Sequence, residues 1–285
     1  MKRDPLALVK RTLKVASLPT AFIKVDEAIN NPRSSNKHLA NIINEDAAIA
    51  AKLLRIANSG FYSFPAKIET VTHAITIIGT QQLRDLVLAC SVVEMFKNIP
   101  EQLVNMESFW RHSIATAVTA RILANYRRDN NVERFFVAGL LHDIGRLVIF
   151  AERAEEAGAA LNKAATSHQL LYRVEYELFG FNHATLGGML LKEWNLPPIL
   201  VETVKYHHHP SRAKQFPIEA SLVQLADLIA NATKKGSSGE QLAPQLDAEA
   251  WAQTGLTASI LPPTLDQLDR QYADAVNFVL GAAAA

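Results

Sequence analysis

The chain contains, from Phe135 to Phe150, the stretch FFVAGLLHDIGRLVIF. Apolar side chains occupy nearly every position of this stretch, which predicts a helix buried on all sides. Within it lie an adjacent imidazole and carboxylate, His142 and Asp143, and a cation, Arg146. A buried carboxylate is costly unless it is paired or bound to a metal ion. The stretch therefore allows two interpretations, an internal ion pair that involves Arg146 or a metal site.

Helical patterns continue from this stretch in both directions along the 285-residue chain. The chain has only 12 Gly and 12 Pro, long alanine- and leucine-rich stretches and no strand-like alternation, so we expect an all-α protein. Ser35 and Asn182 are candidate N-caps. The expected helices cover residues 24–30, 35–44, 47–57, 71–78, 81–96, 109–126, 132–150, 153–167, 170–178, 183–194, 198–206 and 218–234, with two more from near 247 and over 265–280.

Two polar stretches suggest how these helices are divided. A polar stretch over 98–108, which contains Pro100, marks a soft boundary, and KKGSSG at 234–239 is linker-like and expected to end the compact body. We therefore expect an N-terminal helical lobe over 1–103, a second helical lobe over 104–235 and a C-terminal helical extension over 236–285. The first lobe should pack on the second, because its apolar stripes need a partner surface.

Composition excludes several classes of protein. The 29 basic and 28 acidic residues give a formal charge of +1, so we expect no nucleic-acid partner. No apolar run approaches the roughly 18 to 20 residues of a membrane span, and charges at Lys10, Arg11 and Lys14 interrupt any export signal. The single cysteine, Cys90, excludes an intrachain disulfide and fits a reducing compartment. We expect a compact cytoplasmic protein without a membrane partner.

The remaining histidines favour the metal interpretation of the central stretch. A lone histidine in a helix is usually a core or surface residue, and His38, His73 and His168 are interpreted so. Five of the other six, together with two aspartates, supply nitrogen and oxygen donors without cysteine, enough for two metal ions that share a carboxylate. Imidazole-rich sites suit iron, manganese, nickel or zinc. The candidate ligands are His112, His142, Asp143, His183, His207, His208 and Asp227.

These residues carry a resemblance to known families. The first half resembles the HDOD family in LANIINED at 39–46, LLRIANSG at 53–60 and AITIIG at 74–79, and the whole resemblance spans about residues 10 to 235. The second half resembles the HD superfamily of metal-dependent phosphohydrolases, above all its HD-GYP branch, at His112, HDIG at 142–145, HATLG at 183–187, His207-His208 and Asp227.

The resemblance implies a multi-helix HD-superfamily bundle with an additional N-terminal lobe and a role in bacterial signalling or regulation. Many HDOD relatives have incomplete metal sites and no demonstrated activity, whereas this chain matches every HD-GYP-like ligand position. It departs from HD-GYP enzymes at Arg146, where a lysine is usual, and after Pro210, where no Gly-Tyr-Pro loop follows. The residues support metal binding more than hydrolysis of a cyclic dinucleotide.

Two hypotheses for function follow. In the first, the protein is a metal-dependent phosphohydrolase or phosphodiesterase, with Asp143 bridging two ions, Arg146 meeting a substrate phosphate, and a phosphate ester or nucleotide as ligand. His112, His142 and Asp227 would complete one ion's shell, and His183, His207 and His208 the other's. In the second, the protein is a non-catalytic regulatory module with a structural, sensory or vestigial metal site, and its N-terminal lobe binds a signalling protein. Turnover of simple phosphodiesters by metal-loaded protein separates the two.

Overall fold

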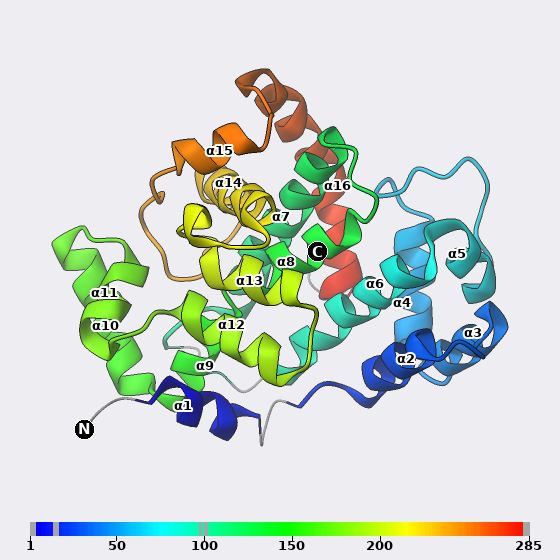
Figure 1. Ribbon diagram of the computed structural model, residues 1–285, viewed down its shortest axis with the longest axis horizontal. Coiled ribbons are helices and arrows are strands. Elements are labelled where there is room, and N and C mark those ends of the chain that lie inside the picture. The colour runs from blue at the N-terminus through cyan, green and yellow to red at the C-terminus, as the bar shows by residue number, and fades with distance from the viewer. Residues whose placement is uncertain (1–3, 14–16, 97–98, 100–101, 282–285) are drawn as a thin grey trace.

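The structure, a computed structural model, describes residues 4–13, 17–96, 99 and 102–281 (Figure 1). All regular elements in these residues are helices, which confirms the all-α class. Residues 98, 100 and 101 of the boundary stretch expected over 98–108 lie outside the described residues, as does the end of the chain from residue 282. The first elements are α1 (Pro5–Thr12), α2 (Thr20–Asn30), α3 (Asn36–Asn44), α4 (Ala47–Ala57), α5 (Val71–Ile78), α6 (Thr80–Val92) and the short 3-10 helix η1 (Val93–Phe96).

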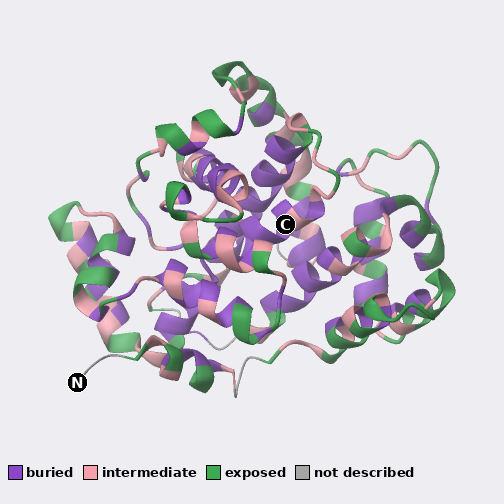
Figure 2. Cartoon of the chain, in the orientation of Figure 1, coloured by how far each residue is buried: buried purple, intermediate pink, exposed green. Residues whose placement is uncertain are grey.

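The second half of the chain surrounds one long buried helix, α7 (Met106–Tyr126), against which α8, α14 and α16 pack (Figures 1 and 2). The remaining elements are α8 (Glu133–Leu141), α9 (Ile144–Glu152), α10 (Ala154–Ser167), α11 (Leu171–Phe179), α12 (His183–Glu193), α13 (Pro198–Tyr206), η2 (Pro210–Arg212), α14 (Pro217–Thr233), α15 (Ala248–Gln253), η3 (Ala258–Ile260) and α16 (Leu261–Val279).

Helix boundaries follow local capping in several places. The Ser35 side chain accepts a hydrogen bond from the backbone nitrogen of His38 at 3.2 Å, and the Asn182 side chain accepts one from Thr185 at 3.0 Å. Both expected N-caps are therefore confirmed. The ranges expected at 47–57, 71–78 and 198–206 coincide with α4, α5 and α13. Helix α1, with the sequence PLALVKRT, was not expected.

The single helix expected over 132–150 is wrong, because the chain turns between α8 and α9 at His142 and Asp143. Asp143 has φ −97° and ψ 7°, outside the helical region. Neighbouring side chains of a straight helix point about 100° apart, whereas here the His142 Nε2 and Asp143 Oδ2 atoms approach to 3.3 Å. The turn is what directs both side chains to one point.

The linker-like tract at 234–239 does not end the compact body, contrary to expectation. Gly236 lies so close to the Ser108 carbonyl and the His112 backbone that a Cβ atom would not fit, and its φ of 97° suits glycine. The backbone nitrogen of Ser237 donates to the Ser108 carbonyl at 3.0 Å, and Ser238 is buried. A glycine- and serine-rich sequence here allows close packing rather than flexibility.

The C-terminal helix joins the two halves of the molecule. Helix α16 packs on α7 on one side and on α4 and α6 on the other (Figure 1). The halves also meet directly, where the Phe61 and Phe136 rings lie 5.4 Å apart and the Tyr62 hydroxyl donates to Glu133 at 2.8 Å. The N-terminal lobe is thus packed on the second lobe, as its apolar stripes predict.

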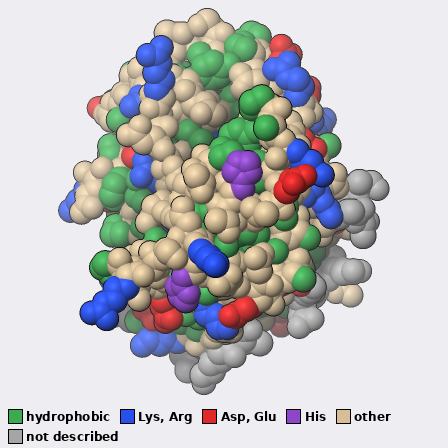
Figure 3. All heavy atoms as spheres, turned by 90° about the vertical axis from the view of Figure 1, so that its right-hand side faces the viewer, with side chains coloured by type: hydrophobic (Ala, Val, Ile, Leu, Met, Phe, Trp, Pro, Cys, Tyr) green, Lys and Arg blue, Asp and Glu red, His purple; other side chains and the backbone are tan. Residues whose placement is uncertain are grey.

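The surface of the N-terminal lobe carries no charged patch of a single sign in the view of Figure 3, where acidic and basic side chains are interspersed around uncharged groups. Among the described helices, none combines the length and the hydrophobicity that crossing a bilayer requires.

Candidate metal centre

The seven candidate ligands come from five places in the chain and meet in the interior of the second lobe. Helix α7 supplies one, the α8–α9 turn two, the start of α12 one, the end of α13 two and α14 one. Each is buried. The structure brings together His112, His142, Asp143, His183, His207, His208 and Asp227.

The histidines and Asp227 form two separate groups, in each of which one ligand atom per residue lies within 4.8 Å of the others. The first group is His112, His142 and Asp227, and the Asp227 Oδ1 atom lies 3.1 Å from the His112 Nε2 atom and 3.6 Å from that of His142.

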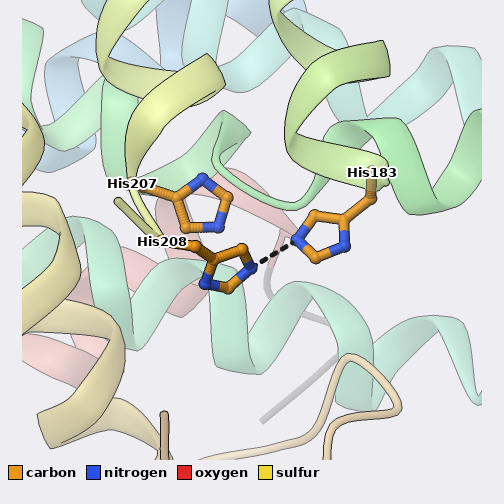
Figure 4. A group of neighbouring side chains, drawn as sticks. All are labelled: His183, His207 and His208. Carbon is orange, nitrogen blue, oxygen red and sulfur yellow. Dashed lines mark hydrogen bonds between the residues drawn. The ribbon is translucent and has the colours of Figure 1, made fainter. Parts of the chain in front are cut away.

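The second group is His183, His207 and His208, whose rings converge from the start of α12 and the end of α13 (Figure 4). The Nε2 atoms of His183 and His208 lie 2.9 Å apart. A group of this composition offers three imidazole nitrogens to one ion, a donor set that suits first-row transition metals.

Asp143 lies between the two groups. Its Oδ2 atom is 3.3 Å from the His142 Nε2 atom and 3.9 Å from that of His112. Its Oδ1 atom is 2.9 Å from the His183 Nε2 atom and 4.0 Å from that of His207. One carboxylate oxygen thus faces each group, a position from which a single side chain could contact two ions.

Backbone carbonyls set the orientation of two of the rings. The Nδ1 atom of His142 donates to the Gly139 carbonyl, and that of His207 donates to the Val204 carbonyl, each at 2.7 Å. Because a carbonyl oxygen can only accept, Nδ1 carries a proton in each ring, and when the ring is neutral its Nε2 atom presents a lone pair to the centre. This is the tautomer that binds a metal ion through Nε2.

Glu175 of α11 sets the orientation of the His183 ring. The sequence alone did not identify this residue. Its Oε2 atom accepts from the His183 Nδ1 atom at 2.7 Å and from the His183 backbone nitrogen at 2.8 Å. Arg146 Nε also lies 3.3 Å from this Nδ1 atom, but the shorter contact to a carboxylate assigns the proton to the His183–Glu175 bond. Glu175 is 3% exposed, although nothing in the sequence separates it from the surface acids around it.

Arg146 is buried and fully engaged. Its Nη1 atom donates to the Ser238 hydroxyl at 2.6 Å and to the Ser238 carbonyl at 3.0 Å, and lies 3.3 Å from the Asp143 Oδ2 atom. Burial by itself raises the pKa of Asp143, but the charges of Arg146, His142 and His183 outweigh it and hold that pKa well below its usual range. Asp143 is therefore ionised at neutral pH. Ser238 was missed because its tract reads as a linker.

Several buried atoms at the centre have no hydrogen-bond partner: the Nε2 atoms of His112, His142 and His207, and the Oδ1 atom of Asp143. The His183 Nε2 atom lies 2.9 Å from the Asp143 Oδ1 atom. Burial lowers the pKa of His183, but the charges of Glu175 and Asp143 outweigh it and raise that pKa, so positive charge is favoured at this point. The residues present therefore fit a centre built to hold cations.

The charge states of the rings agree with this interpretation. Burial, and then the charges of His142 and His183, lower the pKa of His207 to about 3, so that ring is neutral. The pKa of His142 is raised to about 10, because Asp143 and Asp227 outweigh the lowering effect of burial. The two carboxylates thus stabilise positive charge at this point, and a metal ion could take the place of the proton.

The sequence is similar to one protein family and to two curated proteins. Residues 15–210 match the HDOD domain. A curated relative, an uncharacterized protein of Treponema pallidum, is 22% identical over 225 residues, which are 78% of this chain and 43% of the relative. Ribonuclease Y of Opitutus terrae is 32% identical over 133 residues, 46% of this chain and 19% of that enzyme. The chain spans less than half the length of these relatives.

Solved structures share the fold over nearly the whole chain. An HDOD protein of unknown function from Geobacter sulfurreducens has a TM-score of 0.73 and 24% identity, with 96% of each chain covered. A proposed phosphohydrolase from Shewanella amazonensis has a TM-score of 0.72 and 26% identity, with 96% of this chain and 97% of the other covered. A second Shewanella amazonensis protein, described as a proposed metal-dependent phosphohydrolase, has a TM-score of 0.68 and 23% identity, with 96% of this chain and 97% of that one covered.

Proposed function

The chain belongs to the HDOD domain family, and we propose that it is a metal-dependent phosphohydrolase that acts in bacterial signalling. In this proposal the two buried groups each hold a divalent transition-metal ion, which is iron, manganese, nickel or zinc. When bound, such a pair of ions activates water near neutral pH and neutralises charge on the oxygens of a phosphate ester.

The observation that carries this proposal is the position of Asp143. A buried carboxylate that only formed an ion pair would need one cationic partner. Asp143 instead has His142 on the side of its Oδ2 atom and His183 on the side of its Oδ1 atom, at 3.3 and 2.9 Å. The carbonyls behind His142 and His207 keep both rings in the tautomer that leaves Nε2 free for an ion.

A second candidate function is favoured by Arg146. Its guanidinium already supplies a positive charge 3.3 Å from the Asp143 Oδ2 atom and is tied to Ser238 on the other side. In that candidate the protein is a regulatory module, the centre stabilises the fold or senses a metal, and a signalling protein binds the N-terminal lobe. That partner, and the catalytic role predicted for Arg146, stay predictions.

Elemental analysis of the purified full chain tests the metal centre. We expect about two transition-metal ions per chain in the wild type. Asp143→Ala should remove both ions, whereas Asp227→Ala should remove only the ion of its own group. Asp266→Ala, at an exposed carboxylate of α16, is the control and should keep both. No metal above background after reconstitution would refute the centre, and loss of a single ion from Asp143→Ala would refute the bridge.

Hydrolysis of an activated aryl phosphodiester separates the two candidates. If the protein is an enzyme, the metal-loaded wild type should hydrolyse the diester, and His142→Ala should lower the rate by several orders of magnitude. Arg146→Ala should then raise KM more than it lowers metal content, because a guanidinium meets phosphate oxygens rather than a cation. A fully loaded protein that leaves phosphate monoesters, diesters and cyclic dinucleotides intact would assign the chain to the regulatory candidate.

A further inference from the structure

A cavity of about 490 Å³ opens beside the second ligand group, between α11, the start of α12 and the end of α13. His208 lines it, so the cavity reaches the candidate metal centre through one of its own ligands. Its volume lies within the range of about 300 to 1,000 Å³ that small-molecule sites occupy. We call it the His208 pocket; its other lining residues used below are Tyr172, Arg173, Tyr176, Lys205, His209 and Arg212.

The His208 pocket is positively charged. Arg173, Lys205 and Arg212 line it, and among the described residues none of the three forms an ion pair with a carboxylate. Its one acidic lining residue among those described, Glu177, is neutralised by Lys163 at 2.7 Å. Three cations without anionic partners around one cavity are suited to a phosphate group, which accepts several charge-assisted hydrogen bonds.

His209 also lines the pocket, and its ring lies edge-on to the Tyr172 ring, with centroids 5.6 Å apart.

Aromatic side chains supply the other half of the pocket. The Tyr172 ring stacks on the His208 ring, with centroids 4.2 Å apart and planes 17° apart, and so forms the wall toward the centre. Tyr176, 63% exposed, lines the same cavity from the next turn of α11. An exposed aromatic face beside unpaired cations offers a planar ring a stacking surface within reach of a phosphate site.

A larger cavity of the molecule lacks this character. It measures about 1130 Å³, lies between α2 and α13, and is lined by Asp26, Glu27, Glu193 and Glu202 as well as by cations. Carboxylates at such a density repel phosphate, so the smaller pocket is the better anion site.

We propose that the His208 pocket binds a ligand the size of a single nucleotide, with its phosphate among Arg173, Lys205 and Arg212 and its base against Tyr176. This inference deepens the proposed function and rests on it, since it names the substrate class of a hydrolase whose centre the pocket adjoins. Apart from His208, no residue named in the pocket is a candidate metal ligand, so nucleotide binding and metal content can be measured independently.

Calorimetric titration of the full chain with adenosine and guanosine 5′-monophosphates tests the proposal. We expect both nucleotides to bind, and the double variant Arg173→Ala/Arg212→Ala to raise Kd about tenfold or more, since two charge-assisted contacts are lost. Lys214→Ala removes an exposed cation that does not line the pocket and should leave Kd unchanged. Elemental analysis should show equal metal content in all these proteins.

Variants of Tyr176 test recognition of the base. Tyr176→Ala should weaken binding of the nucleotides but not of ribose 5-phosphate, and Tyr176→Phe should restore it, because the ring rather than the hydroxyl stacks. The proposal is overturned if neither nucleotide binds, if the arginine variant binds as the wild type does, or if ribose 5-phosphate binds as tightly as the nucleotides. Metal-loaded protein without nucleotide binding refutes the pocket alone, whereas metal-free protein that binds nucleotide refutes the metal centre alone.

Discussion

At the centre, buried polar side chains have one atom in contact with the protein and another directed at the other ligands. His142 and His207 each give one ring nitrogen to a backbone carbonyl, which leaves the other nitrogen directed at the centre. Asp143 divides its two oxygens between the two groups. Each side chain thus has one atom fixed by the fold and one atom without a protein hydrogen bond, as a ligand-binding site requires.

Glu175 provides a prediction at this scale, because it orients His183 without belonging to either group. Glu175→Gln replaces a charged acceptor by a neutral one, and we expect metal affinity to fall about 10- to 100-fold. Competition with a chelator of known affinity measures the change. Glu177→Gln is the matched control, since Glu177 lies on the same helix but pairs with Lys163 at the surface, and equal losses in both variants would contradict the orienting role.

Cys90 provides a second prediction. Its side chain is 2% exposed, and burial raises the pKa of its thiol to about 12. The thiolate is the reactive form, so at pH 8 the native protein should not react with a thiol reagent, whereas the denatured chain should react with one equivalent of it. The absorbance change with an aromatic disulfide reagent, recorded with and without guanidinium, measures this. Rapid reaction of the native protein would show that α6 opens readily.

At the scale of helices, close approach rather than helix propensity decides where the ligands lie. Gly145 of α9 faces the His183 carbonyl and the Gly187 nitrogen of α12, and a Cβ atom would lie 2.6 Å from that nitrogen. Gly139 of α8 lies equally close to the α7 backbone at Ala117. These two glycines allow α8 and α9, the helices on either side of His142 and Asp143, to reach the helices that carry other ligands.

Gly145→Ala should therefore destabilise the fold and the centre together. Backbone atoms that the new Cβ meets cannot move aside as a flexible side chain can, so we expect a loss of about 1 to 3 kcal/mol or more in the free energy of unfolding, with reduced metal content. Gly158→Ala is the control within α10, where a Cβ atom would lie 3.6 Å from the nearest atom. That change should stabilise the helix by up to about 1 kcal/mol. Urea unfolding of both variants measures the change in the free energy of unfolding. No change in Gly145→Ala would contradict the close packing of α9 on α12.

At the scale of the whole molecule, the C-terminal extension is part of the core. Phe278 is fully buried, and its ring lies 6.4 Å from that of Phe136 on α8. Helix α16 also contacts α4, so it covers the junction of the N-terminal lobe with the second lobe. Cooperative unfolding of both lobes is the expected consequence.

Phe278→Ala should lower the free energy of unfolding by about 3 to 5 kcal/mol, because it leaves a cavity in a well-packed region. Metal content should not change, since Phe278 is not one of the candidate ligands. Leu265→Ala on the same helix is the control: its side chain is 39% exposed, and we expect a change within about 0.5 kcal/mol. Thermal unfolding monitored by circular dichroism compares the two. Equal stability of both variants would show that α16 is not part of the core.

The sequence by itself determined the helical class, most of the helix positions and the identity of the residues that meet at the centre. These follow from local properties. Alanine and leucine at helical spacing form helices wherever a partner surface exists, Ser35 and Asn182 cap the helices that follow them, and a histidine or carboxylate in an apolar stretch needs a compensating partner.

Only the tertiary structure decided how those residues are grouped and what surrounds them. Glu175 and Ser238 lie 29 and 92 residues from Arg146 along the chain, yet all three adjoin the centre. The turn at His142, the burial of Ser238 within the KKGSSG tract and the gathering of Arg173, Lys205 and Arg212 around one cavity likewise depend on which helices approach one another. Burial and electrostatic pairing act between neighbours in space, and a single sequence lists its residues in the order of the chain.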